Sequence, residues 1–230
     1  MRKFLKKNEI YFSTLSSLLL GIMAIIVSYN SNRISKEQSK MNYFENSPDF
    51  HFSREYLTDS TGYANGIDIQ LNKSRGKAKN IKVKIECYAH FEIMNQNSHE
   101  INRYIHLMDY FESSYNTGKN KGNIKLIRGL NNLKNFSKFE EAIEHELTEK
   151  NYTSVFINNL LIAKITYTDF LNEIKEEYYD VSYGEGILLE ENDFRVDLFN
   201  NLKISPKSIS IADFNLDNIK SCMEIIENNS

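Results

Sequence analysis

Apolar and polar residues alternate with a period of two along much of the chain after Pro48. The longest such run extends from Ile81 to Ile93, where apolar side chains occupy every odd position. Successive side chains of a strand point to opposite faces, so this run predicts a long strand with one buried face. Two runs, at 161–167 and 176–183, flank a short connection around residues 171–173 and predict a hairpin. Shorter runs predict strands at 50–56, 67–71, 123–128, 194–199 and 208–211.

Helical spacing is less frequent. Ser137 and Glu140 have the spacing of a capping box and open a segment with apolar residues four apart, which predicts a helix from Ser137 to Lys150. A second helix is predicted at 217–228, and residues 100–111 fit a helix as well as a strand. Many short strands with few helices predict an α+β domain, an antiparallel β-sandwich-like arrangement with two or three helices.

An uncharged, apolar segment precedes this domain. It covers residues 10–29, and no charged residue occurs from Ile10 to Asn32. A helix of 20 residues rises about 30 Å, the thickness of the hydrocarbon core of a bilayer. A cleaved signal peptide would have a shorter apolar core and small residues at its exit, and a buried core helix is rarely so evenly apolar. The segment therefore predicts a transmembrane helix.

The chain thus divides into four parts. Residues 1–9 form a basic tail, 10–29 the transmembrane helix, 30–47 a polar helical stalk without a breaker, and 48–230 the β-rich soluble domain. The side of the membrane is less strongly indicated. Four basic residues precede the span and three follow within twelve positions, a margin of one charge toward an outside domain. Two observations favour the cytoplasmic side of the cell membrane. The domain contains two cysteines with no evident disulfide, which suits a reducing compartment, and its basic segment would be attracted to the anionic inner leaflet.

Composition excludes several protein classes. A mean hydropathy of −0.49 excludes a protein with many spans, and 9 Gly and 2 Pro exclude collagen-like and low-complexity chains. The net charge of −3 conceals an asymmetry, because residues 1–134 carry +8 and residues 135–230 carry −11. The two cysteines, Cys87 and Cys222, fall on apolar faces and are too few for a disulfide scaffold or a four-thiolate zinc site.

Six basic residues fall within twelve positions with no acid among them, and they are the candidate ligand-binding residues: Lys73, Arg75, Lys77, Lys79, Lys82 and Lys84. The first four share one side of an extended chain and the last two the other, so the cluster is expected to wrap a strand edge. A basic edge binds nucleic acid, a nucleotide messenger or anionic lipid, but lysines also keep edge strands soluble and unpaired. No aromatic residue lies between 73 and 84 to stack on bases, so nucleic acid has little support.

The remaining motifs carry less chemistry. A second basic segment contains Lys119, Lys121, Lys125 and Arg128. Its residues 118–122 resemble a phosphate-binding loop in composition but lack its spacing, so they are assigned to a flexible turn. Glu141 and His145 are four apart on a predicted helix without an HExxH motif or an evident third ligand. The histidines are scattered, at 51, 90, 99, 106 and 145, and His90 is expected to be exposed. The acidic run at 173–197 lacks calcium-loop spacing. No metal, cofactor or catalytic set is expected.

One resemblance joins these features. The order is an apolar span, a polar stalk, Ser47–Phe50, the segment NKSRGKAKNI at 72–81, and ITYTD at 165–169 before a hairpin. It resembles bacterial single-span membrane proteins with an uncharacterised sandwich domain, over most of the chain. The resemblance implies a β-sandwich and small residues at Gly76 and Ala78 where strands approach closely. Phe170–Glu173 fills the hairpin turn, where that family carries a glycine. Some membrane-anchored phage-defence effectors and nucleotide-messenger sensors share this layout.

These observations predict a membrane-anchored binding or sensing module that recognises an anionic ligand or a protein partner at the lipid bilayer. The alternative is a structural or interaction subunit of a membrane assembly, including a phage-defence effector. A hydrolase or nuclease is a third hypothesis, which would gain if the fold brought His90 or His106 beside carboxylates.

Overall fold

A computed structural model describes residues 4, 7–94, 100–119, 121–152, 154–201 and 208–227 of the chain. The chain divides into two compact units, residues 1–47 and residues 48–230. His99, much of the basic tail and Asn228 lie outside the described residues.

The first unit is built on one long helix, α2 (Glu9–Asn46). Its segment Ser13–Asn46 contains a window of mean hydropathy 1.5 that is not buried, so it is long and apolar enough to cross a membrane. A signal sequence passes the same test of length and composition. The helix ends where Ser47 turns extended before Pro48, and the Ser47 N–H still donates to the Tyr43 carbonyl oxygen at 2.8 Å.

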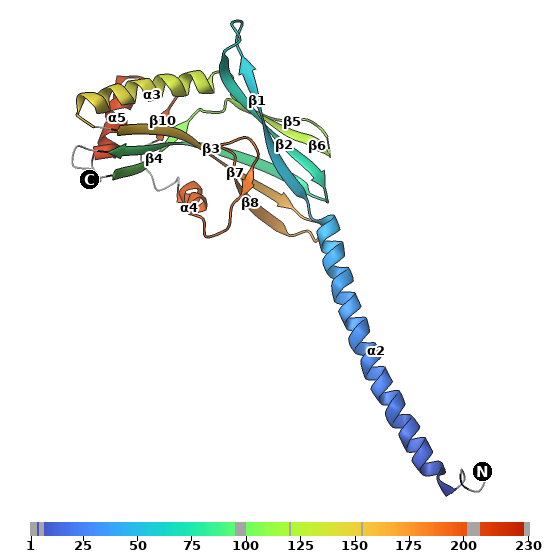
Figure 1. Ribbon diagram of the computed structural model, residues 1–230. Helices are drawn as coiled ribbons and strands as arrows, with labels where there is room; N and C mark the ends of the chain where they lie inside the picture. The colour runs from blue at the N-terminus through green and yellow to red at the C-terminus, as the bar shows by residue number, and fades with distance from the viewer. Residues whose placement is uncertain are drawn as a thin grey trace. The chain divides into compact units, whose positions relative to one another are not determined.

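Two sheets make up most of the second unit (Figure 1). The four-stranded sheet has the order β1-β2-β6-β5 and consists of β1 (Asp49–Thr58), β2 (Ala64–Arg75), β6 (Gly122–Arg128) and β5 (Ser113–Asn116). The six-stranded sheet has the order β10-β4-β3-β7-β8-β9. It consists of β10 (Ser208–Ser210), β4 (Glu100–Met108), β3 (Lys79–Met94), β7 (Ser154–Thr168), β8 (Ile174–Asp180) and β9 (Ile187–Leu188).

The apolar faces of both sheets contribute to one core. Its fully buried members include Phe52 and Ile69 from the four-stranded sheet and Phe91 and Leu161 from the six-stranded sheet. The Phe52 ring meets Tyr179 of the other sheet edge to face, with 5.3 Å between ring centroids. The prediction that β3 has one buried face is confirmed, since every second side chain of this strand faces the core.

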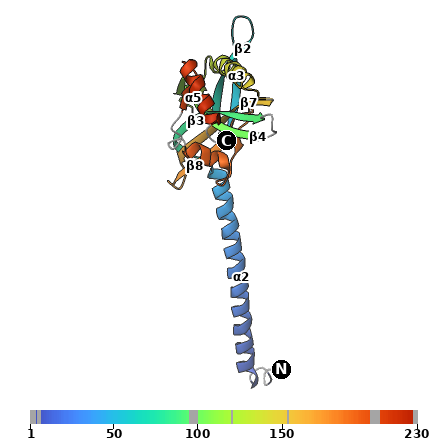
Figure 2. The ribbon, with the colours of Figure 1, turned by 90° about the vertical axis from the view of Figure 1, so that its left-hand side faces the viewer.

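Helices α3 (Asn132–Glu149) and α5 (Leu216–Glu227) also pack on the core. They lie next to one another in Figure 2, and the Lys150 ammonium donates to the Glu227 carboxylate at 2.5 Å just beyond α3. The capping-box prediction is wrong, because α3 begins at Asn132 and places Ser137 inside the helix. The buried Asn132 side chain, bonded to the backbone of Ile67, fixes this earlier start.

Two further expectations need correction. Residues 194–199 are not a strand but belong to helix α4 (Phe194–Asn200), whose N-cap Asp193 accepts a hydrogen bond from the Arg195 N–H at 2.9 Å. The sheets are not wholly antiparallel, because β10 pairs with β4 in parallel. The ambiguous residues 100–111 form strand β4 up to Met108, since they pair with β3 along its length.

Candidate functional site

Two basic turns lie at the same end of the four-stranded sheet. One turn, residues 76–78, joins β2 to β3, and the other, which includes Gly118, Lys119 and Lys121, joins β5 to β6. Strands β2 and β6 are neighbours, and Lys73 is paired with Gly122. This pairing brings together two segments that lie about 40 positions apart in the sequence.

Backbone geometry at both turns requires glycine. Gly76 has a φ of 75° and Gly122 also has a φ of 75°, in the left-handed region where a Cβ atom is strained. The resemblance implied that Gly76 is small because strands approach closely, and its positive φ gives a direct local reason. Glycine here turns the chain sharply, so that the lysines on either side are presented at the strand ends.

An open pocket of about 540 Å³ lies between these turns. The cationic residues that line it are Lys73, Arg75, Lys77, Lys79 and Lys121. A second pocket of about 300 Å³ shares Ala78 and Lys79 with the first and adds Lys119 and Lys125. We call the two pockets together the basic cleft. None of the residues that line the basic cleft is aromatic or acidic.

Charge pairing within the basic cleft is sparse. The Arg75 guanidinium lies 3.8 Å from the carboxylate of Asp49, which also accepts a hydrogen bond from Ser74. Among the described residues, no acid forms an ion pair with Lys77, Lys79 or Lys121, and all three are exposed. The basic cleft is therefore a region of uncompensated positive charge.

Two residues along the cleft are partly withdrawn from water. Lys73 is buried, with 7% of its surface exposed. Burial also lowers the pKa of the Lys125 ammonium from its ordinary value. Their positive charges are therefore less screened by solvent than those of the exposed lysines.

The structure separates Lys82 and Lys84 from the other four candidate residues. Neither lines the basic cleft. Lys84 forms an ion pair with Glu86, and its ammonium lies 5.6 Å from the centroid of the Phe199 ring. Both lysines alternate with Ile81, Val83 and Ile85, which pack against the core, so they lie on the face of β3 that points away from it. The sequence marked Lys119, Lys121 and Lys125 as part of a second basic segment, but its position beside residues 73–79 became visible only through the pairing of β2 with β6.

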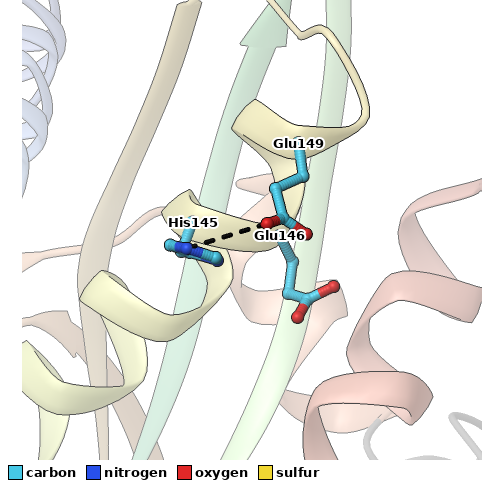
Figure 3. A group of neighbouring side chains, drawn as sticks. All are labelled: His145, Glu146 and Glu149. Atoms are coloured by element: carbon cyan, nitrogen blue, oxygen red, sulfur yellow. Dashed lines mark ion pairs between the residues drawn. The ribbon is translucent and has the colours of Figure 1, made fainter.

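A group of possible metal ligands lies on α3 (Figure 3). It consists of His145, Glu146 and Glu149, whereas the sequence had indicated Glu141 as the partner of His145. The His145 imidazole lies 3.9 Å from the Glu149 carboxylate, and both side chains are about two-thirds exposed. Acid and histidine side chains gather in this way on solvated helices without an ion, so the group gives no specific indication of a metal.

The other candidate reactive side chains, two cysteines and one histidine, are buried or in contact with neighbouring side chains. Cys87 and Cys222 are buried free thiols, and burial raises the pKa of each, which disfavours the nucleophilic thiolate. His90 was expected to be exposed, but it is partly buried. Its ring is stacked on Tyr104 at 4.4 Å between centroids and lies 2.7 Å from the Asn102 side-chain oxygen.

The chain matches no protein-family model, no curated protein and no solved structure.

Proposed function

We propose that this protein is a membrane-anchored binding module that recognises an anionic ligand through the basic cleft. The observation that carries the proposal is the convergence of two separate basic turns on one pocket without acidic lining residues. The expectation that the lysines at 73–84 protect an edge strand is wrong, because β2 lies between β1 and β6 and β3 lies between β4 and β7. In this proposal the two-sheet domain is a sandwich-like scaffold that holds the turns in place.

The chemistry of the lining favours phosphate over nucleobases. Lysine ammonium groups bind phosphate oxygens as point charges, whereas recognition of single-stranded bases uses aromatic side chains for stacking. The lining residues include no aromatic ring. The proposed ligand is therefore a compact polyanion such as a nucleotide phosphate, an inorganic phosphate chain or a lipid headgroup.

The anchor in this proposal is α2, with residues 10–29 in the bilayer. The absence of charge from Ile10 to Asn32 and the length of the helix support a single-pass protein of the cell membrane. We place the domain in the cytoplasm, where nucleotides and anionic lipids occur and free thiols are stable.

Sidedness has a direct test. Ser60→Cys and Ser114→Cys place thiols at exposed positions, while the native thiols are buried. Treatment of intact cells with a membrane-impermeant maleimide should leave both variants unlabelled until lysis. Labelling before lysis would place the domain outside and contradict this part of the proposal.

Ligand binding is tested with the full chain in phosphatidylcholine nanodiscs, titrated with inorganic tripolyphosphate in a calorimeter. The variant Lys77→Glu/Lys79→Glu/Lys121→Glu should bind at least tenfold more weakly, because three attractive charges become repulsive. The control Lys134→Glu/Lys138→Glu/Lys220→Glu changes net charge equally at exposed positions away from the basic cleft and should bind as the unmodified chain does. Equal weakening in both variants would show that net charge alone, and not the cleft, attracts the anion.

A second candidate function, an interaction subunit of a membrane assembly, has its own supporting observation. An open pocket of about 970 Å³ beside edge strand β9 is lined by Glu176, Glu177, Glu190 and Glu191 together with Leu188. Ile187 and Leu188 are about 60% exposed. Apolar side chains surrounded by acids suit a basic, partly apolar segment of a protein partner. Co-purification of a specific protein that is lost with Leu188→Lys would favour this function.

A further inference from the structure

Three neighbouring strands place a serine, a histidine and a glutamate in one hydrogen-bonded row. Ser208 on β10 is the register partner of His106 on β4, and Glu86 lies on the next strand, β3. The His106 Nδ1 atom is 2.8 Å from Ser208 Oγ, and Nε2 is 2.8 Å from Glu86 Oε2. A nucleophile, a base and a group that orients the base have this arrangement in serine hydrolases of unrelated folds.

The protonation states follow from the partners. Burial alone would raise the pKa of Glu86, but the hydrogen bond with His106 and the ion pair with Lys84 outweigh it and hold that pKa below its ordinary value. An ionised carboxylate can only accept, so Nε2 of a neutral His106 carries the proton. Nδ1 is then an acceptor that faces the Ser208 hydroxyl.

The row is held firmly in place. The side chains of His106 and Glu86 are only 11% and 12% exposed. The Tyr88 ring lies 5.5 Å from the imidazole ring, and its hydroxyl donates to the Leu198 carbonyl oxygen at 3.3 Å. Side chains fixed on adjacent strands keep their geometry better than side chains on loops.

The serine lies on an open edge of the described sheet. Strand β10 is the last strand in the order, and the Ile211 N–H donates to the Met108 carbonyl oxygen of β4. Backbone groups alternate in direction along a strand, so the Ser208 and Ser210 N–H groups point away from β4. No described strand pairs with this side of β10, so the Ser208 N–H can donate to a developing oxyanion beside its own hydroxyl.

We propose that Ser208 is an activated nucleophile for esters, with His106 as its general base and Glu86 as the positioning residue of His106. Ser208 Oγ forms a bond to the carbonyl carbon, and its proton passes to His106 Nδ1. The ester C–O bond then breaks, and the leaving oxygen takes that proton. Water then attacks the acyl carbon and gives its proton to His106. The bond between that carbon and Ser208 Oγ breaks, Ser208 Oγ takes the proton from His106, and a carboxylic acid is released.

The test uses the full chain in detergent micelles and a fluorophosphonate probe, with peptide mass spectrometry as the readout. We expect one adduct on Ser208 and none with Ser208→Ala. The control is Ser210→Ala, on the same strand as Ser208. It removes a hydroxyl that donates to Asp109, and it should label normally. Labelling should slow at least 100-fold with His106→Gln, the contribution typical of a general base, and stay normal with His90→Gln.

The role of Glu86 is tested separately from its contribution to stability. Glu86→Gln should slow labelling, and Glu86→Asp should restore part of the rate, at a temperature where both variants keep the circular dichroism spectrum of the unmodified chain. A wild-type chain without an adduct on Ser208 would overturn the proposal. So would labelling of Ser208 at an unchanged rate in His106→Gln.

Discussion

The paired strands β2 and β6 have opposite environments at their two ends. At one end they carry the basic cleft, where exposed lysines have no acidic partners among the described residues. At the other end, the buried Asp68 carboxylate accepts hydrogen bonds from Arg128 and from the Gly129 N–H, each at 3.2 Å. The comparison shows that one strand pair can be fixed at one end by satisfied buried groups, which leaves the other end free to keep uncompensated charge.

The largest effect is expected at the fixed end. In Gly66→Ala, the new Cβ atom would lie 2.2 Å from the Gly129 carbonyl oxygen and 2.6 Å from that of Leu130. These backbone atoms cannot move aside without a shift of the chain, so the free energy of unfolding should fall by about 3 kcal/mol, measured by urea denaturation. A change below about 1 kcal/mol would mean that the two segments are not in close contact.

The next effect also concerns the fixed end. Asn132 accepts hydrogen bonds from the Ile67 and Leu133 N–H groups, both at 2.9 Å, so Asn132→Ala leaves a buried donor unsatisfied. We expect a loss of about 2 kcal/mol in urea denaturation. The matched control is Asn131→Ala, because the exposed N-cap Asn131 makes no capping hydrogen bond with its side chain. Equal losses in the two variants would remove the special role of Asn132.

A smaller effect is expected from the backbone of the basic cleft. Gly122→Ala meets no neighbouring atom but retains a φ of 75°, which should cost about 1 kcal/mol of stability. Gly122→Asn should cost less, because asparagine tolerates this region of φ better. If both variants were as stable as the unmodified chain, the turn would have relaxed to another conformation.

The smallest effect on stability is expected from the cleft lysines themselves. Lys77→Met/Lys79→Met should change the free energy of unfolding by less than about 0.5 kcal/mol, since both are exposed and neither has an acidic partner among the described residues. The same variant should weaken tripolyphosphate binding and reduce its dependence on salt concentration. Loss of stability without loss of binding would reverse the roles assigned to the two ends.

Sequence periodicity predicted the strands whose two faces have different surroundings. Strand β3 and the β7–β8 hairpin were both predicted, because one face meets the core and the other does not. Residues 194–199 were wrongly predicted to form a strand. Their buried residues, Val196 and Phe199, are three apart on a helix that the Asp193 N-cap starts. Helix α3 began earlier than predicted because a tertiary contact, from Asn132 to Ile67, outweighed a local capping motif.

The candidate site could be predicted only in part. Residues 73–79 and 118–122 both stood out by charge, but their proximity required knowledge that β2 pairs with β6. Strand β5 (Ser113–Asn116), which leads into the second of these segments, is too short and too exposed for a periodic signal. The same limit applies to Ser208, His106 and Glu86, whose spacing along the chain follows no motif.

The position of α5 has a consequence for the biosynthesis of the protein. Cys222, Met223 and Ile226 are buried in the core that both sheets share, yet they follow β1 to β8 in the chain and are therefore synthesised after them. Strands β1 to β8 must therefore await a C-terminal segment before their apolar surface is fully covered. Until α5 is synthesised and packed, part of the apolar face of these strands stays open to water and to aggregation.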